Sequence, residues 1–144
     1  MVRLEPLFLQ EKLQAFLRRE GKVYLVGGYV RDLILGRETR DIDIAVEGSA
    51  LEVARRAAAA LGGSFVPLDQ ERGIARVVGE GFSLDFASLK GEISRDLGGR
   101  DFTINAMAIT LDGQVVDPFG GREDLEARLI RALGEQAFEE DPVR

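Results

Sequence analysis

Apolar residues recur along the chain with two periods, one typical of helices and one typical of strands. Leu7, Leu13 and Leu17 are spaced as on one face of an amphipathic helix, which predicts a helix over residues 6–19 that Gly21 ends. Segments in which apolar and polar residues alternate predict strands. The further predicted helices are 29–35, 50–61 and 122–127, and the predicted strands are 23–26, 41–46, 64–68, 74–79, 82–87, 105–111 and 114–116.

The order of these segments indicates the fold class. Residues 88–100 are predicted to form a loop with some helix, and residues 133–144 an acidic helix. Several predicted strands follow one another directly, which differs from a regular alternation of strand and helix. We therefore expect one domain over residues 1–144 with an α/β fold of the α+β type. Its sheet is expected to be mixed, mostly antiparallel and flanked by helices on one side.

Composition excludes several kinds of chemistry. Of the 144 residues, 45% are hydrophobic and 31% charged, as in an ordinary globular domain. Residues 1–20 carry charges throughout and no apolar run reaches about 18–20 residues, so we expect a cytoplasmic protein with no membrane partner. Cysteine and histidine are both absent. A bound metal ion therefore requires oxygen ligands, which suits Mg²⁺, Mn²⁺ or Ca²⁺.

The net charge is unfavourable for strong RNA binding by this chain alone. It amounts to −6, whereas proteins that grip RNA by themselves are usually basic. Of the 19 cationic residues, all but Lys12, Lys22 and Lys90 are arginine. Arginine suits bidentate phosphate contacts, but the same richness also follows from genome composition or heat adaptation.

The most informative pattern is Asp41-Ile42-Asp43-Ile44. Residues two apart on a strand share a face, so Asp41 and Asp43 are expected to point the same way, roughly 6–7 Å apart along the strand. Neighbouring carboxylates repel each other unless a cation lies between them, and one or two Mg²⁺ ions would satisfy both. The alternative is an edge strand with a solvated acidic face.

Asp85 lies in a similar pattern over residues 83–87, with the acid on one face and apolar residues on the other. If this strand is a neighbour of strand 41–46, Asp85 could complete a catalytic triad of carboxylates with Asp41 and Asp43. The alternative is a satisfied polar residue on a half-exposed strand.

A glycine pair, Gly27-Gly28, follows the first predicted strand and precedes a predicted helix. Without Cβ atoms the turn allows an anion to approach the backbone N–H groups, and the start of a helix favours negative charge. Arg31 lies one turn further on, within reach of a phosphate, and Asp32 is expected to be structural. The alternative is a plain tight turn. Together with the acidic pair on the next strand, these features suit a triphosphate site beside a metal site, and hence nucleotidyl transfer.

Four segments of the chain carry a further signal. In chain order they are Leu25–Asp32 with Asp41–Asp43, then Arg100–Ala108, Asp117–Leu125 and Glu140–Arg144. These segments resemble the ordered motifs of class II tRNA nucleotidyltransferases and bacterial poly(A) polymerases, which belong to the DNA polymerase β superfamily. The resemblance implies the nucleotidyltransferase fold. It also implies Mg²⁺-dependent addition of CMP or AMP, from CTP or ATP, to an RNA 3′ end, with tRNA as the expected RNA.

The resemblance also implies roles at the matching positions of the first motif. Asp41 and Asp43 would bind the catalytic Mg²⁺ ions. Gly27, Gly28 and Arg31 would contact the incoming nucleotide.

The later motifs imply further nucleotide contacts. Arg100 would contact phosphate or ribose, and Asn105 would help to order that region. Asp141 and Arg144 would read the base, because an aspartate accepts from the exocyclic amine of C or A and an arginine donates to the neighbouring ring nitrogen. An alternative makes Asp141 an N-cap before Pro142.

Three departures from the family pattern bear on function. Gly99 precedes Arg100 where the family usually carries paired arginines, and segment 88–99 has no clear counterpart of an arginine-rich stretch found in some members. The chain is also expected to be the head domain alone, without the neck, body and tail domains that supply most of the RNA grip.

The sequence leaves several functions open. CCA-, CC- and A-addition and poly(A) synthesis are not distinguished. A second hypothesis is a domain that binds nucleotide without turnover. A third is a superfamily relative that modifies a small molecule or a protein, which leaves segments Arg100–Ala108 and Glu140–Arg144 without a role.

Overall fold

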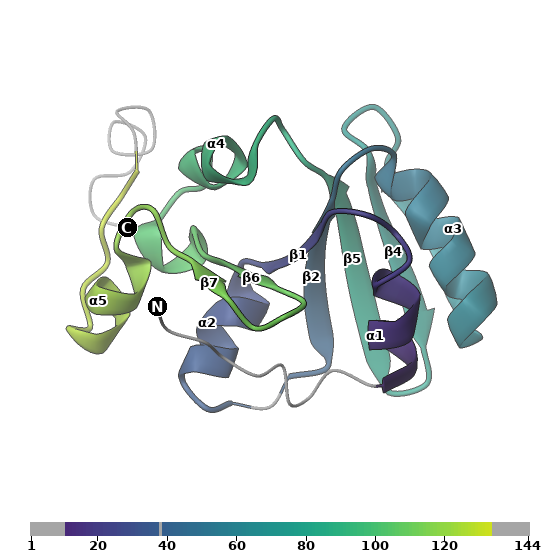
Figure 1. Cartoon of the computed structure of the whole chain (residues 1–144), viewed down its shortest axis with the longest axis horizontal. Helices are drawn as coiled ribbons and strands as arrows, with labels where there is room; N and C mark the ends of the chain where they lie inside the picture. Colours follow the sequence, from purple (N-terminus) through teal and green to yellow (C-terminus); the bar gives the residue numbers. More distant parts are fainter. Residues whose placement is uncertain (1–10, 38, 134–144) are drawn as a thin grey trace.

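The computed structural model of the chain describes residues 11–37 and 39–133. Within them a seven-stranded sheet is surrounded by five α-helices and one short 3-10 helix (Figure 1). The helices are α1 (Glu11–Leu17), α2 (Gly28–Ile34), α3 (Ala50–Leu61), α4 (Ile93–Gly98), η1 (Thr103–Asn105) and α5 (Gly121–Glu126). The strands are β1 (Val23–Val26), β2 (Asp41–Val46), β3 (Ser64–Asp69), β4 (Ile74–Gly79), β5 (Phe82–Ser88), β6 (Ala108–Thr110) and β7 (Val115–Val116).

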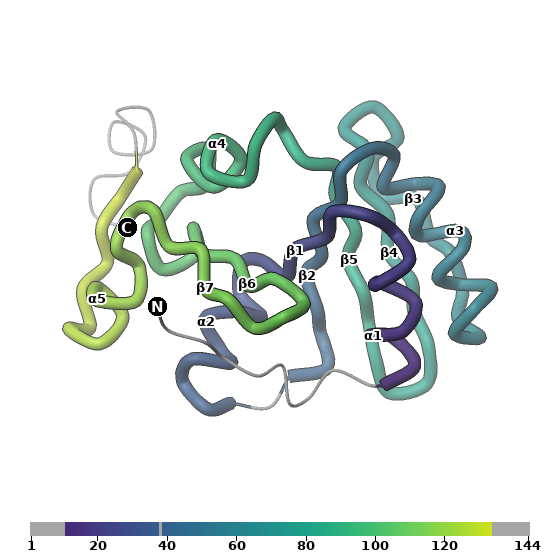
Figure 2. Tube along the Cα trace, in the orientation of Figure 1, coloured from purple at the N-terminus to yellow at the C-terminus, as the bar shows by residue number. Residues whose placement is uncertain are grey.

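The sheet is mixed and mostly antiparallel, as the order of the segments predicts. Its strand order is β3-β4-β5-β2-β1-β6-β7. The pairing of β2 with β5 is parallel, and the other neighbours are antiparallel. Figure 2 shows how the late hairpin β6–β7 lies beside β1 from the start of the chain. Segments from the two ends of the described chain therefore pair directly in the sheet.

Helices cover both faces of the sheet, so the expectation of helices on one side is wrong. The main core lies between the sheet and α1, α2 and α3, and includes Leu17, Val30 and Ala54. On the opposite face Leu97 of α4 packs in a second cluster with Val26 and Ala45. Strand β1 is apolar on both faces, which allows this second layer to form.

The helix α3 illustrates how local sequence sets the packing. Ser49 begins it, because the Ser49 hydroxyl accepts a hydrogen bond from the backbone N–H of Glu52. Gly62 ends it in the left-handed conformation. The buried face carries mostly alanine, which lets the helix lie close to the strands of the sheet: Ala50, Val53, Ala54, Ala57 and Ala58.

The strand predicted over residues 105–111 is only partly correct. Strand β6 begins at Ala108, and the preceding residues Thr103–Asn105 form η1. Gly121 explains the difference, because a Cβ atom there would clash with the backbone carbonyl of Thr103. Close packing of α5 against η1 thus overrides the local strand pattern.

The remaining predicted elements agree to within a few residues where the structure describes them. The helix expected within residues 88–100 is α4, and the described part of the first helix is α1. The helix predicted over 133–144 lies outside the described residues, apart from Leu133. None of the described helices is long and apolar enough to cross a bilayer.

Candidate active site

The two acids of β2 lie at the centre of the sheet. Ile42 and Ile44 are buried in the main core, so Asp41 and Asp43 point to the opposite face, as the alternation predicts. Asp41 is exposed and Asp43 is half-buried. Since β2 is a central strand, the alternative of an edge strand with a solvated acidic face is wrong.

Asp85 lies directly beside this pair. In the parallel pairing of β2 with β5, Asp43 is opposite Asp85. The condition set for Asp85, that its strand is a neighbour of strand 41–46, is therefore met. Burial raises the pKa of Asp43, the neighbouring Asp85 raises it further, and Arg100 lowers it. The pKa of Asp43 is raised on balance, which means that its negative charge is disfavoured. A cation beside the carboxylate would offset this cost.

A basic residue already engages Asp85. The Nε atom of Arg76 donates to Oδ1 of Asp85 at 2.7 Å, and Nη2 donates to Oδ2 at 3.2 Å. Within the part of the chain that the structure describes, no three acidic side chains are arranged to hold a metal ion together. A role of Asp85 as a third catalytic carboxylate stays a prediction.

The glycine turn lies against Asp43. Gly27 has φ 65°, a conformation that side chains rarely adopt. A Cβ atom on Gly27 would lie 3.3 Å from Oδ2 of Asp43 and 3.5 Å from Nη1 of Arg100. A Cβ atom on Gly28 would lie 3.3 Å from Nη2 of Arg31. The missing side chains thus leave room at a point where a carboxylate and two guanidinium groups converge.

Arg31 is held by a residue from the second motif. Its Nη1 atom donates to Oδ1 of Asn105 at 3.0 Å, across 74 positions of sequence. Its Nε atom lies 3.4 Å from Oδ1 of Asp32, and the Arg31 side chain is 34% exposed. The guanidinium group is therefore oriented but still accessible to an anion.

Arg100 is oriented by α4. Its Nη2 atom donates to Oδ1 of Asp96 at 3.3 Å, and the Asp96 side chain is 9% exposed. The other Asp96 oxygen accepts from the backbone N–H of Lys90 at 3.0 Å. Both oxygens of this nearly buried carboxylate are occupied, which fixes Arg100 beside Gly27 and Asp43.

The structure brings most of the predicted site residues to one region, on the face of the sheet that α4 shares. Asp141 and Arg144 lie outside the described residues. The residues brought together are Gly27, Gly28, Arg31, Asp41, Asp43, Asp85, Arg100 and Asn105.

Two contributors were missed at the level of sequence, Arg76 and Asp96. The signal for Arg76 was present, because the short turn between strands 74–79 and 82–87 sets a register that places Arg76 opposite Asp85. Asp96 had no such signal, since it lies in a segment expected to be mainly loop.

A buried acid supports the second motif from α5. Asp124 is 7% exposed and accepts from Oγ1 of Thr103 at 2.6 Å. It also accepts from Nε of Arg131 at 3.1 Å. The backbone N–H of Thr103 in turn donates to the carbonyl of Arg131 at 3.0 Å. These bonds lock η1, which carries Asn105, to the last described segment.

Comparison with known proteins assigns the family. A family profile described as "Poly A polymerase head domain" matches residues 23–95 and 87–131. The chain is 51% identical over 138 residues to the CC-adding tRNA nucleotidyltransferase of Geobacter sulfurreducens, covering 92% of this chain and 32% of that protein. It is 39% identical over 142 residues to the A-adding tRNA nucleotidyltransferase of Aquifex aeolicus, covering 85% of this chain and 17% of that protein.

Solved structures agree with this assignment. The Thermotoga maritima CCA-adding enzyme complexed with tRNA matches with a TM-score of 0.80 and 42% identity, covering 97% of this chain and 36% of that chain. The predicted nucleotidyltransferase fold is thereby confirmed. The chain spans about a third or less of the length of these relatives. By sequence and by fold, the chain belongs to the family of poly(A) polymerase head domains, within which it resembles tRNA nucleotidyltransferases.

Proposed function

We propose that residues 1–144 form the head domain of a tRNA nucleotidyltransferase that adds CMP or AMP, from CTP or ATP, to the 3′ end of tRNA. The observation that carries the proposal is the convergence of Asp43, Arg31 and Arg100, all half-buried, around the buried Gly27. The names of the relatives, which are CC-adding and A-adding enzymes, support the choice of nucleotides and of tRNA. Action on tRNA would place the protein in the cytoplasm.

In the proposed reaction the 3′-hydroxyl oxygen of the RNA attacks the α-phosphorus of the nucleotide. A phosphodiester bond forms, the bond from the α-phosphorus to the bridging oxygen breaks, pyrophosphate leaves with its electron pair, and the hydroxyl proton is released to water. Arg31 and Arg100 would hold phosphate oxygens, since guanidinium groups match phosphate geometry. Asp141 and Arg144 are proposed to read the base.

Asp41 and Asp43 are the residues we propose as ligands of Mg²⁺. The donor set fits, because Mg²⁺ is commonly bound through one or two carboxylates together with phosphate oxygens of the substrate. Burial and the neighbouring Asp85 raise the pKa of Asp43, and a cation beside the carboxylate would offset this effect. When bound, the ion would neutralise charge that develops on the reacting oxygens.

A second candidate is a domain that binds nucleotide without turnover. The cluster of Gly27, Arg31 and Arg100 supports it, because guanidinium groups suit phosphate binding whether or not transfer follows. Poly(A) addition rather than a tRNA-specific reaction is a further alternative, supported by the profile's name.

The test combines two assays on the same 144-residue chain. Labelled CTP or ATP is incubated with Mg²⁺ and tRNA transcripts that lack one or more 3′ nucleotides, and calorimetry measures binding of each nucleotide. We expect the unsubstituted chain to incorporate nucleotide and the double variant Asp41→Ala with Asp43→Ala to incorporate none. Binding without incorporation would support the second candidate, and the absence of both would reject the proposed function. Repeated A-addition to an unrelated RNA would favour the poly(A) alternative.

A further inference from the structure

A basic cavity opens beside the carboxylates on the same face of the sheet. Its volume is about 530 Å³, which lies within the range of ligand sites. Its floor includes Ile74 and Ala87, which are opposite each other in the pairing of β4 with β5. Ala87 lies two residues after Asp85 on β5 and therefore on the same face. The cavity thus adjoins the site without including Asp41 or Asp43.

Four cations line this cavity, although the chain as a whole is acidic. They are Arg72, Lys90, Arg95 and Arg100, and the cavity contains one acid, Asp96. Asp96 already accepts hydrogen bonds with both of its oxygens. The lining therefore has a net positive charge that Asp96 does not neutralise.

Three of these cations are accessible to a ligand. Arg72, Lys90 and Arg95 are all exposed. The ion pair between Arg72 and Asp69 is long, at 3.6 Å, and the Arg72 side chain is 74% exposed, so this pair competes weakly with a ligand. The Cδ atom of Arg95 would lie 3.0 Å from a Cβ atom on Gly91. The absence of a side chain at Gly91 lets the stem of Arg95 lie against the loop that borders the cavity.

The position of the cavity separates it from the glycine turn. The cavity is lined by Ala87 of β5, the strand that carries Asp85. Strand β2, with Asp41 and Asp43, separates β5 from β1, and Gly27 follows the end of β1. In the proposed reaction the triphosphate lies on the glycine side, with Arg31. The attacking RNA strand would then approach from the opposite side, where the cavity lies.

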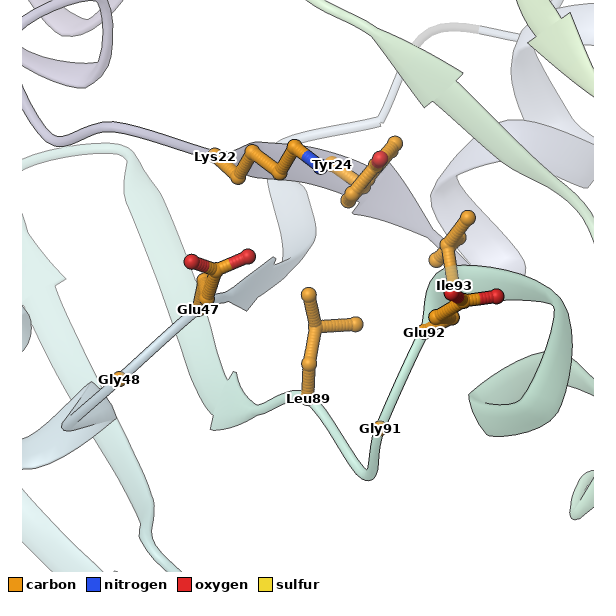
Figure 3. A pocket seen from close by; sticks show the side chains of 8 residues that line it. All are labelled: Lys22, Tyr24, Glu47, Gly48, Leu89, Gly91, Glu92 and Ile93. Carbon is orange, nitrogen blue, oxygen red and sulfur yellow. The ribbon is translucent and has the colours of Figure 1, made fainter.

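A second cavity on this face has a different character. It is about 580 Å³ and is lined by Lys22, by Tyr24 of β1, by Leu89, and by two acids, Glu47 and Glu92 (Figure 3). In Figure 3 Leu89 points toward β1 from the loop below it. Two acids and one cation do not suit a polyanion, so this second cavity lacks the basic lining of the first.

We propose that the cavity formed by Arg72, Lys90 and Arg95, with Arg100 at its border, binds backbone phosphates of the RNA strand whose 3′ end is extended. The inference rests on the proposed function and adds a place for the RNA on the head itself. Phosphodiester groups next to the 3′ end carry the negative charge that this lining complements. Arg100 borders both the cavity and the glycine turn and so lies between the RNA side and the nucleotide side.

The experiment measures RNA binding by the 144-residue chain as a function of salt. Fluorescence anisotropy of a labelled single-stranded RNA is recorded from about 50 to 200 mM salt for the unsubstituted chain and for the triple variant Arg72→Gln, Lys90→Gln, Arg95→Gln. Each lost phosphate contact lowers the slope of log K against log salt by about 0.7, so a decrease of about 2 is expected together with a higher Kd.

A matched control removes the same charge elsewhere. The triple variant Lys12→Gln, Arg18→Gln, Arg19→Gln changes two arginines and one lysine that are exposed on and just after α1. It should keep the slope of the unsubstituted chain. Equal slopes in all three proteins, or no RNA binding by the unsubstituted chain, would overturn the inference.

A nucleotide assay separates the RNA from the triphosphate as the ligand. Calorimetry with CTP and ATP should give the same Kd for the cavity variant as for the unsubstituted chain. Weaker nucleotide binding with unchanged RNA binding would assign the cavity to the triphosphate and overturn the inference. Loss of incorporation in the aspartate variants tests the proposed function independently of either result.

Discussion

At Gly27 the backbone adopts φ 65° and ψ −138°, a combination close to the region that only glycine occupies readily. Its backbone N–H donates to the carbonyl of Met107, which ties the turn to the segment before β6. Asp43 and Arg100 approach the same point. One residue without a side chain therefore permits both the turn and the gathering of charged groups around it.

Replacing Gly27 with alanine tests this role. Gly27→Ala should lower the free energy of unfolding by about 1–3 kcal/mol because of backbone strain. It should also weaken CTP and ATP binding, since the new methyl group lies 3.3 Å from Oδ2 of Asp43. Urea unfolding and calorimetry measure the two effects.

Gly36→Ala is the matched control for this substitution. Gly36 has φ 73°, and a Cβ atom there would meet nothing within 4 Å. Alanine should cost about 1–2 kcal/mol of stability and leave nucleotide binding unchanged. Similar nucleotide affinities in the two variants would contradict a role of Gly27 beyond the turn.

Individual residues differ in how far the sequence predicts their surroundings. Alternation along residues 41–46 is sufficient to place Asp41 and Asp43 on one face, because strand geometry is local. The position of Asp85 beside this pair depended on whether its strand is a neighbour of strand 41–46, and only the fold shows that it is. Contacts such as Arg31 with Asn105 depend on the packing of distant segments and have no local signal.

At the scale of elements, the region around η1 depends on support from α5. Thr103 is 1% exposed, and its hydroxyl is bound to Asp124, which also holds Arg131. Local preference in this segment favours a strand, and the prediction of a strand over 105–111 followed that preference. Tertiary contacts with Asp124 and Gly121 are the physical reason why η1 forms instead.

The charge of Asp124 predicts a pH dependence of stability. The hydrogen bonds from Thr103 and then from Arg131 hold the pKa of Asp124 below its usual value. A lowered pKa in the folded state stabilises the protein fully above the unfolded pKa of about 3.9, and this contribution is lost as pH falls through the folded pKa. Asp124→Asn should therefore unfold at a lower urea concentration at neutral pH. The difference in unfolding midpoint between this variant and the unsubstituted chain should decrease below about pH 4.

The control for this prediction is Asp112→Asn. Asp112 is exposed and its ion pair with Arg18 is 3.7 Å long, so its removal should change stability little at any pH. The difference in unfolding midpoint between Asp124→Asn and the unsubstituted chain could also stay constant with pH. That result would show that lost packing, and not lost charge, explains the lower stability of the variant. Urea unfolding at several pH values provides the measurement.

At the scale of the whole molecule, strand positions were more predictable than strand order. Strands such as 23–26, 41–46 and 74–79 begin and end as predicted, because turns and alternation are local. The order β3-β4-β5-β2-β1-β6-β7 depends on which distant strands pair across long connections. The pattern within a single segment does not indicate its partner. The second layer around α4 was missed for the same reason.

Binding at the site should stabilise the whole fold. A ligand at 100 times its Kd adds about 2.7 kcal/mol to the free energy of unfolding. We expect a gain of this size for ATP with Mg²⁺. In the double variant Asp41→Asn with Asp43→Asn, the free energy of unfolding measured with ATP should be the same with and without Mg²⁺. The pair Glu71→Gln with Glu80→Gln, exposed acids on the β3–β4 and β4–β5 turns, should keep the full gain. An equal Mg²⁺ effect in both double variants would place the ion elsewhere.

The parallel pairing of β2 with β5 also affects the order of events during synthesis. A ribosome releases Asp43 well before Asp85, and α3, β3 and β4 lie between them in the chain. Closing so long a connection costs entropy before the pairing stabilises it. A nascent chain that has released only its first acidic pair therefore lacks the strand that completes this part of the sheet, and we expect it to gain nucleotide affinity only after β5 has left the ribosome.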